Sequence, residues 1–548
     1  MVMFIIFALI YFQIFFFMKT KTLKSLSLFI IFVILFTACK SPVPKSTEEV
    51  PDNSWLEEIT ITRLQQGYKD GKYTINEVVS AYLDRIIEID KYGPELNSVI
   101  EINPDAIQIA AELDREMAEG KIRGALHGIP VILKDNIDTH DRMPNSAGAT
   151  VLKNSFPGSD SWVTKKLREA GAVIIAKSNL SEWANFRAMM SSSGWSGVGG
   201  QTKNPYVLDR NPCGSSSGSG VAVSANLCMV AIGTETNGSI VCPSNNNGIV
   251  GLKPTVGLIS RSGIIPISFT QDTPGPMGRT VEDVAICLGT MTGVDPADSK
   301  TTNSKGHFLT DYTEFLKKNG LEGKRIGLLR KSMGFSVRVD SLIRQSVKDL
   351  KLQGAEVIEV ELPAGEDYEK ASFEVMLYEF KEGLNKYFAG LGENAPVKNL
   401  KELIEFNKRD TVELKYFDQK ILEMAEKKGD LNSPEYKKAL TRMLKATRED
   451  GIDKIMNNNR LDALMAPTGS PAWKTDLLLG DHYVGGNSSL AAISGYPSIT
   501  VPMGFIEDLP VGVSFFGRAW SEPLLLEIAY SYEQGTSHRK APEYLVTD

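Results

Sequence analysis

Short apolar segments that alternate with helical patterns constrain most strongly how this chain can fold. Residues 128–133 and 172–176 are apolar, and a lysine ends each segment, at Lys134 and Lys177. Between them, the apolar spacing of residues 161–169 indicates an amphipathic helix. Buried strands that alternate with helices favour an α/β layered domain with parallel strand pairing.

The strand pattern returns late in the chain, after a long charged segment. Residues 290–450 are charged and helix-rich, although 324–329 and 355–360 within them have the character of strands. Further apolar strand segments follow at 461–466, 498–502 and 511–516. A sheet that resumes this late predicts one domain over residues 54–548, with a helix-rich insertion at about 290–450.

The start of the chain has the features of an export signal followed by a tether. Three lysines, an apolar run at 26–36 and small residues before Cys39 are typical of a secretory signal. A cysteine at this point resembles the lipid attachment site of bacterial lipoproteins. We therefore expect residues 1–39 to direct export, Cys39 to carry a lipid, and residues 40–53 to form a flexible tether. This arrangement predicts a membrane-anchored protein facing the periplasm or the cell exterior.

Two alternatives stay open for this segment. The run at 26–36 can instead be part of a membrane segment in which Cys39 is an ordinary buried residue. The apolar residues 1–17 either form an additional membrane segment or precede a natural start at Met18.

Charge and ligand content argue against several classes of function. The net charge of −7 offers no broad attraction for phosphates, so no nucleic acid partner is expected. The five histidines lack metal-ligand spacing, so no metal or cofactor is expected. Cys213, Cys228, Cys242 and Cys287 lie among apolar or small residues and are expected to be buried free thiols. The sequence does not determine an oligomeric state.

Two glycine- and serine-rich segments, 213–220 and 233–243, hold the candidate chemistry. Glycines allow tight backbone paths whose N–H groups can converge on an anion. The alternative is that both segments are ordinary loops with no role in catalysis. Residues 214–218 formally match the GxSxG nucleophile elbow, but Asn211 and Pro212 before them are poor strand material. The phosphate-binding P-loop motif is absent from the sequence.

These segments, taken with others along the chain, resemble the amidase signature family. The matching motif segments are 126–138, 213–220, 233–243, 251–255, 495–504 and 509–512. The resemblance covers roughly residues 55–540. Within the family, Glu235 and the segments 257–266 and 271–277 are most similar to the bacterial peptide amidase branch.

The resemblance implies a fold and a set of site residues. The family fold is a single α/β domain in which helices cover both faces of a large mixed sheet. Ser239 matches the family's nucleophile, Ser215 its bridging serine and Lys134 its base, and the peptide bond before Ser215 is cis in the family. The candidate donors of the oxyanion hole are the backbone N–H groups of Thr236, Asn237, Gly238 and Ser239. Ser216 is expected to support the site by hydrogen bonding.

A lysine can accept a proton only when it is neutral, and its ordinary pKa is about 10.4. Lys134 follows apolar residues, so we expect it to be buried, which lowers the pKa of its amine. Lys177 and Lys253 also follow apolar segments, so spacing alone does not choose among the three lysines. The resemblance selects Lys134 as the base and leaves Lys177 and Lys253 as structural residues.

The resemblance predicts an amidase that converts a carboxamide into a carboxylate and ammonia or an amine, through a seryl acyl-enzyme. Its expected substrate is a small amide or an amidated peptide. One alternative is an amidotransferase A-type subunit that supplies ammonia for tRNA-dependent transamidation, which the export signal argues against. The other is a non-catalytic lipoprotein that binds amides or peptides, which the presence of all three catalytic residues argues against.

Overall fold

Eleven strands form one mixed sheet in the computed structural model, which describes residues 53–362 and 368–547. From edge to edge the order is β1-β3-β2-β6-β8-β7-β12-β13-β11-β9-β10. The strand bounds are β1 (Val99–Ile102), β2 (Pro130–Lys134), β3 (Val173–Ser178), β6 (Val230–Glu235), β7 (Val250–Lys253), β8 (Thr273–Gly278), β9 (Arg325–Leu329), β10 (Glu356–Val360), β11 (Ala463–Pro467), β12 (Ser498–Ile506) and β13 (Leu509–Phe516). A separate ribbon pairs β4 (Trp195–Ser196) with β5 (Gly200–Gln201).

The pairing directions make the sheet mixed, as expected. Strand β2 runs parallel to β3 and β6, and β9 runs parallel to β10 and β11. The remaining neighbours in the main sheet pair antiparallel. Every apolar segment predicted as a strand lies in this sheet.

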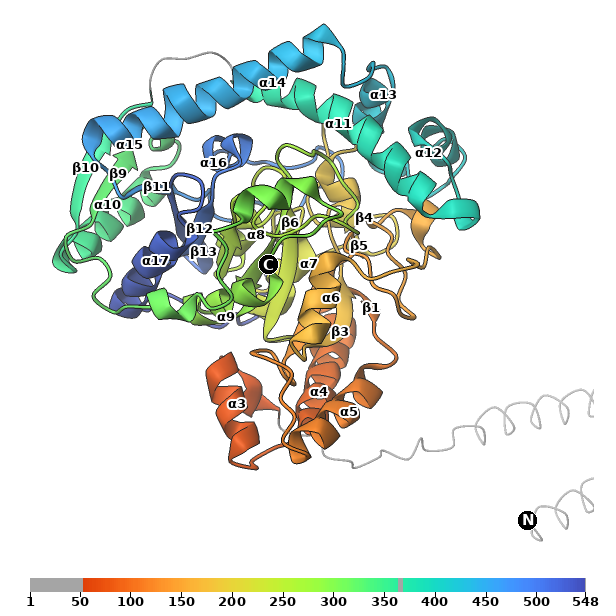
Figure 1. Cartoon of the computed structure of the whole chain (residues 1–548), viewed down its shortest axis with the longest axis horizontal. Coiled ribbons are helices and arrows are strands. Elements are labelled where there is room, and N and C mark those ends of the chain that lie inside the picture. The colour runs from red at the N-terminus through yellow and green to blue at the C-terminus, as the bar shows by residue number, and fades with distance from the viewer. Residues whose placement is uncertain (1–52, 363–367, 548) are drawn as a thin grey trace, which may run out of the picture. The chain divides into compact units, whose positions relative to one another are not determined.

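Helices cover the sheet, as expected for the fold (Figure 1). The α-helices of the described residues are α3 (Ile61–Lys69), α4 (Ile75–Arg85), α5 (Ala106–Ala118), α6 (Trp162–Glu169), α7 (Ser217–Ser224), α8 (Val241–Asn246), α9 (Val281–Met291), α10 (Val337–Leu352), α11 (Tyr368–Gly390), α12 (Leu400–Asn407), α13 (Lys420–Glu426), α14 (Pro434–Thr447), α15 (Asp453–Asn459), α16 (Ser489–Ser494) and α17 (Glu522–Thr536). Two π-helical segments, Ile86–Tyr92 and Arg448–Ile452, continue α4 and α14.

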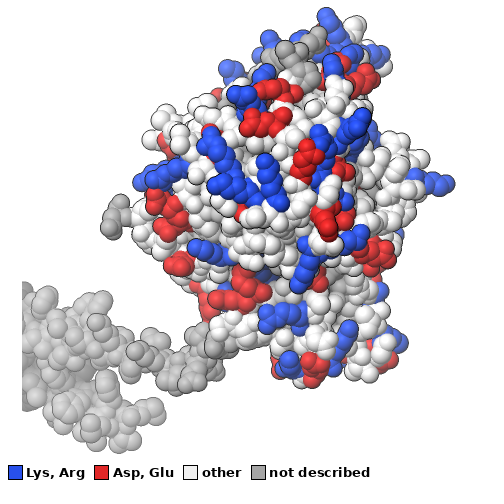
Figure 2. Space-filling view, turned by 90° about the vertical axis from the view of Figure 1, so that its left-hand side faces the viewer, with Lys and Arg blue, Asp and Glu red and all other residues white. Residues whose placement is uncertain are grey.

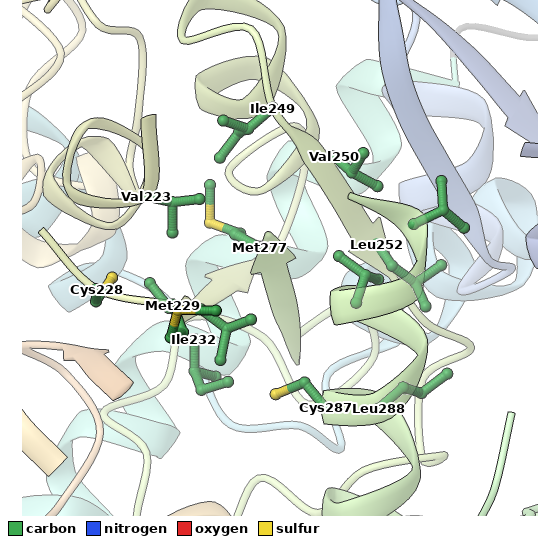
Figure 3. Packing of buried hydrophobic residues seen from close by; sticks show 14 of the residues in the cluster. Val223, Cys228, Met229, Ile232, Ile249, Val250, Leu252, Met277, Cys287 and Leu288 are labelled. Carbon is green, nitrogen blue, oxygen red and sulfur yellow. The ribbon is translucent and has the colours of Figure 1, made fainter. Parts of the chain in front are cut away.

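The core near the candidate chemistry lies between the centre of the sheet and helices α7 and α9. Figure 3 shows buried side chains of β6, β7 and β8 together with Val223 of α7 and with Cys287 and Leu288 of α9. Helix α7 is buried along its whole length because it consists of small residues. A Cβ at Gly218 would lie 2.2 Å from the Ser98 carbonyl oxygen, so only glycine permits this close approach.

The segment 290–450 is helix-rich but also extends the sheet. Its strands β9 and β10 form one edge, with β9 pairing in parallel to β11. The long helices α11 and α14 pack against each other and arch across the top of the view in Figure 1. The insertion therefore belongs to the same layered body as the strands that precede and follow it.

Residues 53–548 form one compact unit. Residues 1–39 with Cys39, and the tether up to residue 52, lie outside the described residues. No helix within 53–362 or 368–547 combines the length and apolar character needed to cross a membrane. Figure 2 shows one face of the molecule, on which acidic and basic side chains are interspersed with uncharged surface.

Candidate active site

The C-terminal end of β2 places Lys134 against two polar segments. The lysine is fully buried. Its Nζ lies 2.7 Å from Ser215 Oγ, 2.9 Å from Thr234 Oγ1 and 3.2 Å from the Thr234 carbonyl oxygen. Thr234 belongs to β6, which pairs in parallel with β2, so the sheet itself brings the amine to this threonine.

Burial lowers the pKa of Lys134 to about 7, because the charged ammonium loses its hydration. The negative charges of Asp272 and Glu235 oppose this shift only in part. Among the described residues, the groups within hydrogen-bond reach of the amine are hydroxyl and carbonyl oxygens alone.

The loop before α7 presents Ser215 and Ser216. The Gly214–Ser215 peptide bond is cis. Ser216 Oγ donates to the Thr234 carbonyl oxygen at 3.1 Å and accepts from the Thr234 N–H at 3.2 Å, which fastens this loop to β6. The Ser216 N–H also donates to the Ser239 carbonyl oxygen at 3.2 Å. This bond holds the segment that carries Ser215 directly beside the segment that carries Ser239.

Ser239 lies in the turn between β6 and α8 and is 8% exposed. Among the hydrogen bonds of residues 53–362 and 368–547, none engages its hydroxyl. Ser215 and Ser239 are thus neighbours through their backbones, while the Ser239 oxygen stays available to a substrate.

The Glu235 carboxylate organises this turn. It accepts the N–H groups of Gly238 and Ile240 at 2.8 Å each and that of Val241 at 3.0 Å. The Gly238 N–H is therefore engaged inside the turn, which leaves the amides of Thr236, Asn237 and Ser239 as candidate oxyanion donors. Sequence reasoning used Glu235 only as a marker of the family branch, because no local pattern shows which amides a carboxylate will reach.

The side chains of Thr236 and Asn237 point to other elements. Thr236 Oγ1 donates to Asp272 at 2.6 Å. The Asn237 amide accepts from Ser488 Oγ at 2.7 Å and donates to Ser489 Oγ at 3.3 Å, at the N-terminal end of α16. Both side chains thus hold the turn in place, and their backbone N–H groups are the parts that remain for a ligand.

A disulfide joins the two serine segments. Cys213, two residues before Ser215, is bonded to Cys242, three residues after Ser239, with their Cα atoms 6.0 Å apart. The expectation of free thiols is wrong for this pair, because the fold brings together two cysteines that are distant in sequence. Cys228 and Cys287 are buried free thiols, as expected.

The other two lysines have hydrogen-bond partners away from the two serines. Lys177 Nζ donates to the Ile137 carbonyl oxygen at 2.5 Å and to Asn145 Oδ1 at 3.0 Å. Lys253 Nζ donates to the Pro254 carbonyl oxygen at 3.0 Å. Both are buried, and burial lowers the pKa of each.

A cavity of about 630 Å³ adjoins the site, at the size usual for small-ligand pockets. Thr234, Glu235 and Thr236 line one wall, and the segment 261–274 and the end of α11 contribute others. Among the described residues, no group of three or more His, Cys, Asp or Glu side chains is arranged to hold a metal ion.

Known proteins share both the sequence and this architecture. The Amidase family model matches residues 77–526. A protein of Arabidopsis thaliana described as a probable amidase is 39% identical, and the match covers 89% of this chain and 92% of that protein. The solved structure of a peptide amidase from Stenotrophomonas maltophilia is 48% identical with a TM-score of 0.84, over 89% of this chain and 99% of that one.

A second group of relatives is described as amidotransferase subunits. The A subunit of a glutamyl-tRNA(Gln) amidotransferase from Alkaliphilus metalliredigens is 34% identical, over 87% of this chain and 96% of that protein. The family model and these relatives all cover most of the chain, from the helices before β2 to the last strands of the sheet. The chain belongs to the amidase signature family and is an amide-hydrolysing enzyme.

Proposed function

We propose that this enzyme hydrolyses the terminal carboxamide of amidated peptides and the carboxamide of small amides to a carboxylate and ammonia, with Ser239 as nucleophile, Ser215 as proton relay and Lys134 as base. The observation that carries the proposal is the 2.7 Å contact between the buried Lys134 amine and Ser215 Oγ. The likeness to peptide amidase structures, 48% identical in one case, supports the choice of substrate class.

The hydrogen-bond geometry around Lys134 suits a neutral amine. Such an amine has two N–H donors and one lone pair. The two oxygens of Thr234 can accept both donors, and the lone pair then faces the Ser215 hydroxyl. Ser215 can pass its proton to Lys134 and take one from Ser239 in the same movement.

The reaction then follows in two steps. The Ser239 oxygen attacks the carbonyl carbon of the amide while its proton moves through Ser215 to Lys134. Free amides of the 236–239 turn stabilise the resulting oxyanion. The C–N bond breaks as the stored proton returns to the leaving nitrogen, which departs as ammonia. A water molecule repeats the sequence on the ester and releases the carboxylate and free Ser239.

Ammonia release from a panel of amidated dipeptides and simple amides tests the proposal. We expect turnover of amidated peptides by the wild-type chain and its loss in Ser239→Ala. In that variant the fold should persist, because the Ser239 hydroxyl bonds to no other described group. Turnover that is unchanged in Ser239→Ala would contradict the mechanism and favour an adventitious activity. Activity on simple amides alone would exclude the peptide class and retain the amidase chemistry.

We also propose that the enzyme is exported and held at a membrane by a lipid on Cys39. The signal-like residues 1–39 support this location, and so does the disulfide between Cys213 and Cys242, because such bonds persist in oxidising compartments. Mass spectrometry of the N-terminal peptide should find an acylated Cys39 with nothing before it. An unmodified peptide that spans Cys39 would contradict the proposal.

The relatives named as amidotransferase A subunits support a second candidate, the supply of ammonia within a larger complex. Hydrolysis of amides by the isolated chain, at a rate that added amidotransferase partners do not change, separates the two functions. Inactivity of the isolated chain, with glutamine hydrolysis on addition of partner subunits, would favour the second candidate.

A further inference from the structure

Residues 473–486 are here called the rim loop. Hydrogen bonds join this part of the chain to the segments that carry Ser215 and Ser239. At one end, the Asn211 N–H donates to the Trp473 carbonyl oxygen at 2.7 Å, four residues before Ser215. After its other end, the chain continues through Ser488 into α16, and Ser488 Oγ donates to Asn237, two residues before Ser239. The residues at the start of the rim loop and just after its end therefore bond to residues that precede Ser215 and Ser239.

Asp481 joins the rim loop to a second segment, residues 189–193. Its carboxylate accepts from the N–H and Oγ of Ser193, at 2.9 and 2.5 Å, and from the Trp473 indole at 3.1 Å. It also lies 3.3 Å from the Asn211 side-chain amide. The Asp481 N–H in turn donates to the Ser191 carbonyl oxygen at 2.9 Å. One partly buried carboxylate thus ties together the rim loop, the 189–193 segment and the approach to Ser215.

Both joined segments expose large apolar side chains. Leu478 is 86% exposed and Leu479 is 62% exposed. The other exposed apolar side chains of these segments are Met189, Met190, Tyr483 and Val484. A contiguous patch of exposed apolar side chains often marks a binding site. Because Trp473 bonds to Asn211 and Ser488, just after the rim loop, bonds to Asn237, the loop lies beside both serine segments.

We propose that the rim loop and residues 189–193 form an apolar subsite for the acyl side of the substrate, next to the scissile carboxamide. This inference rests on the proposed function and narrows its substrate class to amidated peptides with apolar side chains near the C-terminus. The exposed leucines contact the apolar side chain and remove it from water, while Asp481 keeps the two segments together. The subsite acts on substrate binding and leaves the chemistry at Ser239 unchanged.

The test compares two surface leucine changes in the full chain. The double variant Leu478→Ser/Leu479→Ser alters the rim loop. The matched control, Leu352→Ser, alters a leucine that is 85% exposed at the end of α10. Ammonia release is measured with acetyl-Leu-Leu-NH2 and acetyl-Gly-Ser-NH2, and folding is checked by circular dichroism.

For the apolar substrate we expect KM to rise about fivefold to twentyfold in the double variant, with kcat within about twofold. The polar substrate and the control variant should give wild-type values. Equal changes for both substrates, or no change for either, would overturn the subsite. A double variant that loses only its binding to phosphatidylglycerol vesicles would also overturn it, since the leucines then serve a lipid surface. A wild-type chain that hydrolyses no amide would instead overturn the proposed function itself.

Discussion

The ends of β2 and β3 carry two buried lysines with different surroundings. In the register of these parallel strands, Leu133 is opposite Lys177 and Lys134 is opposite Ser178. Side chains alternate between the faces of a sheet, so Lys134 and Lys177 point to opposite faces. Lys134 and Lys177 are thus offset by one residue in the strand register. Because of this offset, the Lys134 amine reaches Ser215, whereas the Lys177 amine reaches Asn145.

The comparison shows that burial alone does not make a lysine a base. Burial lowers the pKa of both amines. Lys134, however, bonds to hydroxyl and carbonyl oxygens, whereas Lys177 lies 4.0 Å from the carboxylate of Asp135. A nearby carboxylate favours the charged amine, which suits a structural role, and a nearby hydroxyl gives a neutral amine a proton to accept.

The sharpest way to break this comparison is to remove each amine in turn. In Lys134→Ala we expect kcat for amide hydrolysis to fall by about 10⁴-fold or more, because Ser239 loses its base. The fold should persist, since the described partners of the amine are hydroxyl and carbonyl oxygens and the truncation breaks no hydrogen bond to a carboxylate. Steady-state ammonia release and thermal melting measure the two effects. A residual rate within tenfold of wild type would show that another group accepts the proton.

The matching change at the other lysine should act on stability. Lys177→Met leaves the buried Asp135 without its nearby amine, and we expect the free energy of unfolding to fall by about 3 kcal/mol. The rate per folded molecule should stay within about threefold of wild type. Urea denaturation with parallel activity assays separates these quantities. A large loss of amide hydrolysis in a fully folded Lys177→Met variant would contradict the assignment of Lys177 as structural and Lys134 as the base.

The pH dependence of the wild type sharpens the assignment further. Because the active form of Lys134 is neutral, kcat/KM should rise with pH and level off above the lysine pKa of about 7. Between the plateau and pH 5 we expect a loss of about 100-fold. Rates that are flat from pH 5 to pH 9 would mean that no group with this pKa acts as base.

The smallest expected effect on activity comes from substituting one hydrogen-bond partner of each lysine amine. Thr234→Val removes a hydroxyl that accepts from Lys134, and we expect kcat to fall by about tenfold. The midpoint of the pH profile should move to lower pH, because the protonated amine loses an acceptor. Asn145→Ala removes the corresponding partner of Lys177, and the pH midpoint should not move. A shift of equal size in both variants would point to a general loosening of the sheet.

The alternation of apolar segments and helices was sufficient to predict the α/β class and most strands of the sheet. The choice of Lys134 depended on the family motif, since Lys134, Lys177 and Lys253 all follow apolar segments. Strand order, and with it the opposite faces of the two lysines, depends on pairings between distant segments. The disulfide and the capping of the turn by Glu235 were missed for the same reason.

The Cys213–Cys242 bond turns the intervening stretch into a closed ring, with a sequence separation of 29 between its ends. Ser215, β6 and Ser239 all lie inside that ring. A protease that cleaves the backbone between the two serines would therefore release no fragment, because the disulfide would still link the two pieces. For an enzyme exported as proposed, this arrangement would let a molecule clipped by secreted proteases keep its two serines in one particle.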